Sequence, residues 1–116
     1  MDLEQTEAEC AAGAGPRVSL AAMEAKIDAV HHFLASEAVE AMGQPVTPSM
    51  RLLSVCILVM RNGFSIIGKS APASALRFDA NLGRKLAYED AIRQLWPLEG
   101  YALRTRLYDE EQNKAE

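Results

Sequence analysis

Five residues around position 80 have side chains that suit recognition of a phosphorylated base. Arg77 and Phe78 come just before an expected helix start, and Asn81, Arg84 and Lys85 lie in its first turns. Arginine forks match the geometry of phosphate groups, and aromatic rings stack on nucleobases. Free N–H groups at a helix start also favour anions. This stretch therefore predicts a ligand-binding recess for a phosphate and a base.

Three further candidates lie elsewhere in the chain. Arg61, Phe64 and Arg104 can reach such a recess only if a hairpin or a neighbouring subunit brings them there. Arg104 and Arg106 point to different sides of a helix, so at most one of them joins any given site unless subunits share it. A simpler role for Phe78 is a hydrophobic staple onto Leu82.

Groups of residues that typify catalysis are missing from the sequence. It has no Gly-X-Ser-X-Gly nucleophile elbow, and Gly68-Lys69-Ser70 lacks the upstream glycine of a phosphate loop. The adjacent acids Glu89 and Asp90 point apart on a helix and make a poor acid and base pair. No spacing of His, Cys, Asp and Glu suggests a metal site. We expect a binding protein with no cofactor and no metal, not an enzyme.

Charge is unevenly distributed along the chain. Residues 1–50 carry a net charge of -6, residues 51–107 carry +5, and the rest carry -3. The basic middle favours an anionic partner, although basic residues can also simply coat a solvated face. The basic set is small, aromatic residues are sparse and the ends are acidic, so a nucleic acid is not the expected partner.

The most regular stretch predicts a β-hairpin. Two apolar, β-prone runs at about 52–60 and 64–70 flank Asn62-Gly63, a strong signal for a type I′ turn. A two-residue turn places Met60 opposite Ser65, Val59 opposite Ile66 and Leu58 opposite Ile67.

Both faces of the first strand are apolar, which indicates that both are covered. Helices of this chain would cover one face, and more of the chain or another subunit would cover the other. Because two strands alone are marginally stable in water, we expect a homo-oligomer.

The segments around the hairpin predict an α+β fold in one domain, 18–108. Residues 1–17 are acidic and rich in Ala and Gly, and we expect them to be disordered. Ser19 suits the start of an amphipathic helix over about 19–42, which places His31 and His32 on its surface, and residues 43–51 suit a linker. After the hairpin, Asp79 or Asn81 can cap a helix that Trp96-Pro97 breaks or kinks. A short last helix within 98–108 and an acidic tail, 109–116, complete the chain.

The chain shows no basic and apolar leader, and no apolar run long enough to span a bilayer. We therefore expect it in the cytoplasm of the cell that makes it, with no membrane partner.

Several motifs taken together resemble one family. They are Asn62-Gly63-Phe64, Phe78-Asp79, Gly83-Arg84-Lys85 and the run from Trp96 to Tyr101, Trp-Pro-Leu-Glu-Gly-Tyr. Over residues 18–107 the chain resembles the small phage protein family of the coliphage gp-forty-nine and Shigella-phage gene-sixty-six type. It departs from the family pattern in the loop with Pro72 and Arg77. The resemblance implies a phage or prophage protein that acts in the bacterial host cytoplasm.

The chain is also similar to the Thoeris anti-defence proteins of phages. That similarity implies an oligomeric sponge, which binds signalling nucleotides such as cyclic ADP-ribose isomers, and in some cases cyclic di- or trinucleotides, without degrading them. The alternative is a phage accessory protein that binds a host protein as an adaptor or inhibitor, through the first helix and the acidic tail.

Overall fold

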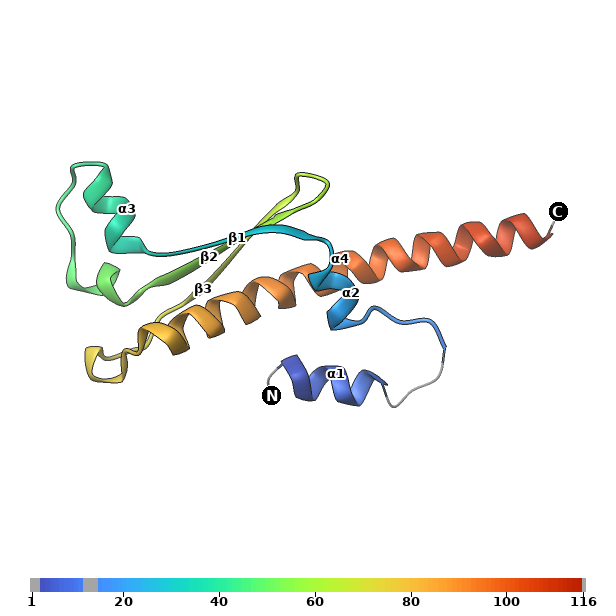
Figure 1. Ribbon diagram of the computed structural model, residues 1–116, viewed down its shortest axis with the longest axis horizontal. Helices are drawn as coiled ribbons and strands as arrows, with labels where there is room; N and C mark the ends of the chain where they lie inside the picture. Colours follow the sequence, from blue (N-terminus) through green and yellow to red (C-terminus); the bar gives the residue numbers. More distant parts are fainter. Residues whose placement is uncertain (1–2, 12–14, 116) are drawn as a thin grey trace.

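The computed structural model describes residues 3–11 and 15–115 and has an α+β fold (Figure 1). Its elements are α1 (Leu3–Ala11), α2 (Leu20–Glu24), β1 (Ile27–Leu34), α3 (Ala35–Ala41), the 3-10 helix η1 (Pro48–Leu52), β2 (Ser54–Met60), β3 (Ser65–Ser70), the 3-10 helix η2 (Ala75–Arg77) and α4 (Ala80–Ala115). The strands form one antiparallel sheet in the order β1-β2-β3. The predicted α+β class and the hairpin of β2 and β3 are confirmed.

The core lies between α4 and one face of the sheet, with α4 packed against β2 and β3. Apolar side chains of α4 pack against those of the two strands, and Met23 of α2 is buried in the same core. The fully buried members of this core are Met23, Cys56, Leu58, Ala87, Ala91 and Ile92. In Figure 1 the C-terminal part of α4 continues past the sheet.

A glycine allows β3 to lie directly on α4. A Cβ atom at Gly68 would lie 2.1 Å from the carbonyl oxygen of Ala87 and 2.6 Å from the backbone nitrogen of Ala91. Backbone atoms of a helix cannot move aside as a flexible side chain can. The contact therefore requires glycine on the strand and small residues on the helix.

The predicted register of the hairpin is wrong by one residue. Val59 lies opposite Ser65, and Leu58 lies opposite Ile66 instead of Ile67. The loop has three residues, because Met60 pairs with Phe64 and only Gly63 has a positive φ, of 89°. A type I′ turn needs positive φ at two residues, whereas a type I turn followed by a left-handed glycine needs one. This register turns Ile66 toward α4 and Ile67 toward the opposite face.

The predicted helix over 19–42 is wrong in its middle, where β1 pairs with β2. Ser19 does cap a helix, since its Oγ accepts a hydrogen bond from the Ala22 N–H, but this helix, α2, has only five residues. A bulge between Ile27 and Ala29 shifts the alternation of β1. Ile27 and Val30 consequently share one face although they are three residues apart. The spacing of three and four that predicted a helix therefore also fits a bulged strand.

One continuous helix replaces the two predicted C-terminal helices. The carboxylate of Asp79 accepts hydrogen bonds from the N–H groups of Asn81 and Leu82, which confirms Asp79 as a cap. Pro97 lies inside α4 and does not end it. Proline removes one backbone hydrogen bond of a helix, and α4 continues past this exposed residue.

The two ends of the chain also differ from expectation. Residues 3–11, expected to be disordered, form α1, and the acidic tail continues α4 to Ala115. The parts of the predicted disordered segment at 1–2 and 12–14, and the last residue, 116, lie outside the described residues. Within the described ranges no helix has the length and apolar character needed to cross a membrane.

The sheet face turned away from α4 is defined here as the open sheet face. The register places on it Ala29, His31, Phe33, Val55, Ile57, Val59, Ser65, Ile67 and Lys69. Ile67 is 59% exposed, and the valines and Ile57 are partly exposed. The third strand comes from this chain, so no second subunit is needed to supply it. The second face was expected to be covered, but in one protomer its apolar side chains stay partly exposed.

The observed register can be tested with two neighbouring isoleucines. Ile66→Ala should lower the free energy of unfolding by about 2–5 kcal/mol because it empties a core position. Ile67→Ala should lower it by less than about 1 kcal/mol in dilute protein, because Ile67 is exposed. Urea unfolding followed by circular dichroism measures both. The reverse ranking would support the two-residue turn.

The contact of Gly68 with α4 predicts a second pair of opposite effects. Gly68→Ala should destabilise the protein by about 3 kcal/mol, because the new methyl group meets helix backbone. Gly100→Ala is the matched control, since nothing lies within 4 Å of a Cβ at that helical position. It should stabilise the protein by about 0.5–1 kcal/mol. Equal midpoints of thermal unfolding for the two variants would contradict the packing described.

Candidate functional site

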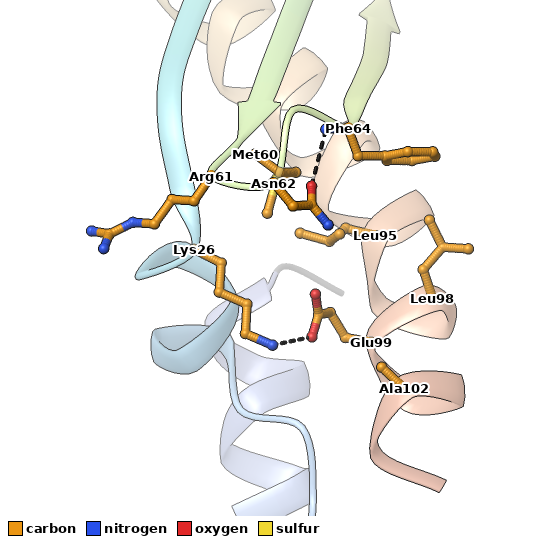
Figure 2. Close-up of a pocket in the computed structure, with 9 residues that line it drawn as sticks. All are labelled: Lys26, Met60, Arg61, Asn62, Phe64, Leu95, Leu98, Glu99 and Ala102. Atoms are coloured by element: carbon orange, nitrogen blue, oxygen red, sulfur yellow. Dashed lines mark hydrogen bonds and ion pairs between the residues drawn. The ribbon is translucent and has the colours of Figure 1, made fainter. Parts of the chain in front are cut away.

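One pocket lies where the hairpin turn meets the middle of α4. Its volume is about 360 Å³, within the range of roughly 300–1,000 Å³ that is usual for small-molecule sites. Figure 2 shows the side chains that line this hairpin pocket. They are Lys26, Met60, Arg61, Asn62, Phe64, Leu95, Leu98, Glu99 and Ala102.

The three-residue turn places Phe64 at this pocket. The side-chain oxygen of Asn62 accepts a hydrogen bond from the Phe64 N–H at 3.0 Å, which fixes the backbone at the start of β3. Phe64 is 53% exposed and Leu98 is 48% exposed. In Figure 2 the ring of Phe64 and the side chain of Leu98 lie on the same side of the pocket. They offer an apolar surface on which a planar ring can stack.

An ion pair crosses the pocket between segments far apart in the sequence. Lys26 Nζ lies 2.6 Å from Glu99 Oε2, and the Glu99 side chain is only 16% exposed. The sequence gives no signal for either residue, because Lys26 falls within the helix predicted over 19–42 and nothing connects it with a residue 73 positions away. The pair supplies a cation that an anionic ligand can contact, next to a carboxylate that balances it.

Arg61 lines the pocket but does not point into it. Figure 2 shows its guanidinium directed away from Phe64 and Leu98. Arg61 is exposed on the hairpin turn, so its side chain has room to rotate toward a ligand. Of the eight candidates from the sequence, this pocket therefore contains two, Arg61 and Phe64.

Arg77 and Phe78 line a smaller recess at the start of α4. Its volume is about 110 Å³, and Leu82 and Pro72 also line it. The presence of Phe78 and Leu82 in one recess fits the staple role for Phe78. The recess is too small to enclose a nucleotide.

Asn81 and Arg84 are linked to each other on the first turns of α4. Arg84 Nη1 donates a hydrogen bond to Asn81 Oδ1 at 3.0 Å. Arg84 lines a recess of about 190 Å³ together with His32 and Glu37. Burial, and secondly the charge of Arg84, lower the pKa of His32. His31 and His32 are adjacent on a strand, so they face opposite sides of the sheet instead of sharing a helix surface.

Lys85 lies in yet another recess, between α2 and α4. Tyr88 and Glu24 also line it, and the Tyr88 hydroxyl donates a hydrogen bond of 2.5 Å to Glu24. Burial and this carboxylate raise the pKa of Tyr88. The hydrogen bond fastens α2 to α4, so this recess has a structural role that needs no ligand.

Six of the eight candidates lie at opposite ends of the sheet. Gly83 packs against Ser54 at the start of β2, whereas the hairpin pocket includes Met60 at its end. The seven residues of β2 span about 20 Å. Arg77, Phe78, Asn81 and Arg84 are at the first end, and Arg61 and Phe64 at the second. Arg104 lies further along α4 and pairs with Glu111 at 3.2 Å.

The described residues hold no group of three or more His, Cys, Asp and Glu side chains arranged to bind a metal ion. The hairpin pocket offers stacking, apolar contact, an amide and one cation. This set of groups can bind a ring that carries an anionic group.

Comparison with known proteins places the chain in one family. Residues 19–107, most of the chain, match the phage protein (N4 Gp49/phage Sf6 gene 66) family. Neither the curated proteins nor the solved structures include a significant match. The matched segment begins at the cap of α2 and ends on α4, so it contains the whole sheet and the hairpin pocket. The chain therefore belongs to the phage protein (N4 Gp49/phage Sf6 gene 66) family.

Proposed function

We propose that this phage protein binds a small nucleotide signal of host immunity and sequesters it without degrading it. The proposed ligands are cyclic ADP-ribose isomers, with cyclic di- or trinucleotides as further members of the class. The observation that carries the proposal is the hairpin pocket, with Phe64 and Leu98 beside the cation of Lys26. The similarity to Thoeris anti-defence proteins supplies the ligand class.

The composition of the pocket supports a ligand with a base and a phosphate. An aromatic ring can stack on any nucleobase, and a lysine binds phosphate as a point charge. Its volume of about 360 Å³ suits one compact nucleotide better than a polymer. Glu99 lowers the net positive charge of the hairpin pocket, and this disfavours ligands that carry many phosphates.

Three further statements belong to the same proposal. The protein is a binding protein and not an enzyme, it acts in the bacterial cytoplasm during infection, and it works as a homo-oligomer. Oligomers would let Arg104 approach the hairpin pocket of a neighbouring copy. That arrangement would unite candidates that one protomer keeps apart.

The alternative function is binding of a host protein as an adaptor or inhibitor. The open sheet face favours it, because Ile67 is exposed among other apolar side chains and such a patch can bind a protein. The helix over 19–42 that was expected to carry this interaction is replaced by α2, β1 and α3. Under this alternative the protein binds none of the cyclic ADP-ribose isomers or cyclic di- and trinucleotides. Ile67→Asp then abolishes capture of the host protein.

Two phenylalanines in different recesses test where the ligand binds. Phe64→Ala should weaken nucleotide binding about 10- to 100-fold, because stacking of one base contributes about 1–3 kcal/mol. Phe78→Ala, in the recess at the start of α4, is the matched control and should leave the dissociation constant within about twofold. Isothermal titration calorimetry with a cyclic ADP-ribose isomer measures both. A loss confined to Phe78→Ala would move the site to the start of α4.

Sequestration differs from catalysis in what leaves the protein. Native mass spectrometry with a panel of cyclic ADP-ribose isomers and cyclic di- and trinucleotides should show one ligand bound. Heating the complex should then release that ligand with its mass and chromatographic retention unchanged. Release of a chemically altered nucleotide would show that the protein is an enzyme and not a sponge. Binding of no nucleotide from the panel would contradict the proposal.

A further inference from the structure

Two polar side chains of the hairpin pocket each keep one hydrogen-bonding group free within the described residues. The first is Asn62, whose side-chain oxygen accepts from the Phe64 N–H at 3.0 Å. This bond settles which end of the amide is oxygen, so the other end is the NH₂ group. Across residues 3–11 and 15–115 that NH₂ group has no hydrogen-bond partner. Asn62 therefore offers a donor to a molecule that enters the pocket.

The second side chain, Glu99, offers an acceptor. Its Oε2 pairs with Lys26 Nζ at 2.6 Å, and no residue in the described ranges bonds to Oε1. A ligand that fills the pocket displaces the water around this carboxylate, whose side chain is only 16% exposed. Leaving a charged acceptor unpaired costs more than leaving a neutral one unpaired. A ligand that covers Glu99 must therefore bring a donor to it.

The backbone holds this donor and this acceptor in one part of the pocket. In Figure 2 the Asn62 amide nitrogen and the oxygen of Glu99 that is not paired with Lys26 are both directed toward the space between the two side chains. The carbonyl of Lys26 accepts from the Arg61 N–H at 2.9 Å. That bond ties the segment that carries Lys26 to the turn that carries Asn62. The pocket thus presents a preformed donor and acceptor beside the surface on which a ring can stack.

We propose that Asn62 and Glu99 read the edge of the bound base and select adenine. The amino group of adenine donates to Glu99, and the neighbouring ring nitrogen N1 accepts from Asn62. Hypoxanthine has the same shape but the reverse order, because its O6 accepts and its N1–H donates. This inference rests on the proposed function, and it narrows the ligand class to nucleotides that contain adenine.

The orientation of the ligand is what makes this order count. Lys26 lies beside Glu99, so a phosphate bound to Lys26 holds one end of the ligand at that side of the pocket. Stacking on Phe64 sets the plane of the ring. Hypoxanthine could satisfy both Asn62 and Glu99 only by turning its edge around, which would move its phosphate away from Lys26. The pocket can therefore distinguish two bases of equal size.

The first test changes the base and leaves the protein unchanged. One pair of probes is a cyclic ADP-ribose isomer joined through its two riboses, which leaves the adenine edge unsubstituted, and its hypoxanthine counterpart. The other pair is cyclic di-AMP and cyclic di-IMP. In each pair that binds, the adenine ligand should bind at least about tenfold more tightly, because O6 of hypoxanthine would face the carboxylate. Isothermal titration calorimetry measures the dissociation constants.

The outcomes separate this inference from the proposed function. Equal dissociation constants within a pair would overturn the reading of the base but leave sequestration standing. Binding of only those cyclic nucleotides that lack adenine would do the same. A protein that binds no nucleotide at all would overturn both.

The second test changes the two residues that read the base. Asn62→Asp still accepts from the Phe64 N–H but has no donor, and Glu99→Gln keeps an oxygen for Lys26 and gains a donor. Each variant pairs one group of hypoxanthine that the wild type repels, so each should reduce the preference for adenine to about threefold or less. The double variant should prefer hypoxanthine. Circular dichroism verifies folding.

Lys26→Gln is the matched control. Glutamine can still donate to Glu99 but carries no charge for a phosphate, so both bases should bind more weakly by the same factor. The ratio of their dissociation constants should stay at the wild-type value. A ratio that changes with Lys26→Gln but with neither Asn62→Asp nor Glu99→Gln would overturn the proposal.

Discussion

The close contact between Gly68 and α4 sets how this helix lies on β3. It brings a strand onto a helix so tightly that Ala87 and Ala91 must be small. Once these two alanines face β3, helical geometry determines where their neighbours point. Asp90 and Gln94 reach the outer edge of β3, while Leu95 and Glu99 reach the hairpin. The hydrogen bonds of Asp90 and Gln94 at the outer edge of β3 and the hairpin pocket thus both follow from one packing contact.

The sequence predicted the fold class and the hairpin because their signals are local. Asn62-Gly63 does mark the turn, and Asp79 does cap α4. The exact register depended on whether Asn62 adopts a positive φ. Asparagine occurs with either sign of φ, so the residue type alone does not choose between the two-residue and the three-residue turn. The helix predicted over β1 had a similar cause, since a bulge gives a strand the spacing of a helix. For β1, pairing with β2, which is distant in sequence, decided between the two structures that the residues allow.

The candidate site was harder to predict because its residues come from three distant segments. Basic and aromatic residues near position 80 are adjacent in sequence, and that adjacency suggested a common recess. In the structure they spread over separate recesses, while Phe64 joins Lys26 and Glu99 at the other end of β2. Basic and aromatic residues that cluster in the sequence can therefore serve the packing of the fold instead of a common binding site. Arg84 holds Asn81, and Phe78 shares a recess with Leu82.

The charges in the hairpin pocket limit what it can recognise. Although residues 51–107 carry a net charge of +5, that charge is not collected in one place. Lys26 is balanced by Glu99, and Arg61 is directed outward. A ligand bound mainly by charge would find little net attraction here, and salt would screen the exposed Arg61 further. In the proposed function, affinity would therefore come chiefly from the surface of Phe64 and Leu98, and Lys26 would select for a nearby anionic group. Such a division of roles suits a compact molecule that presents a base and few phosphates, and it argues against an extended nucleic acid.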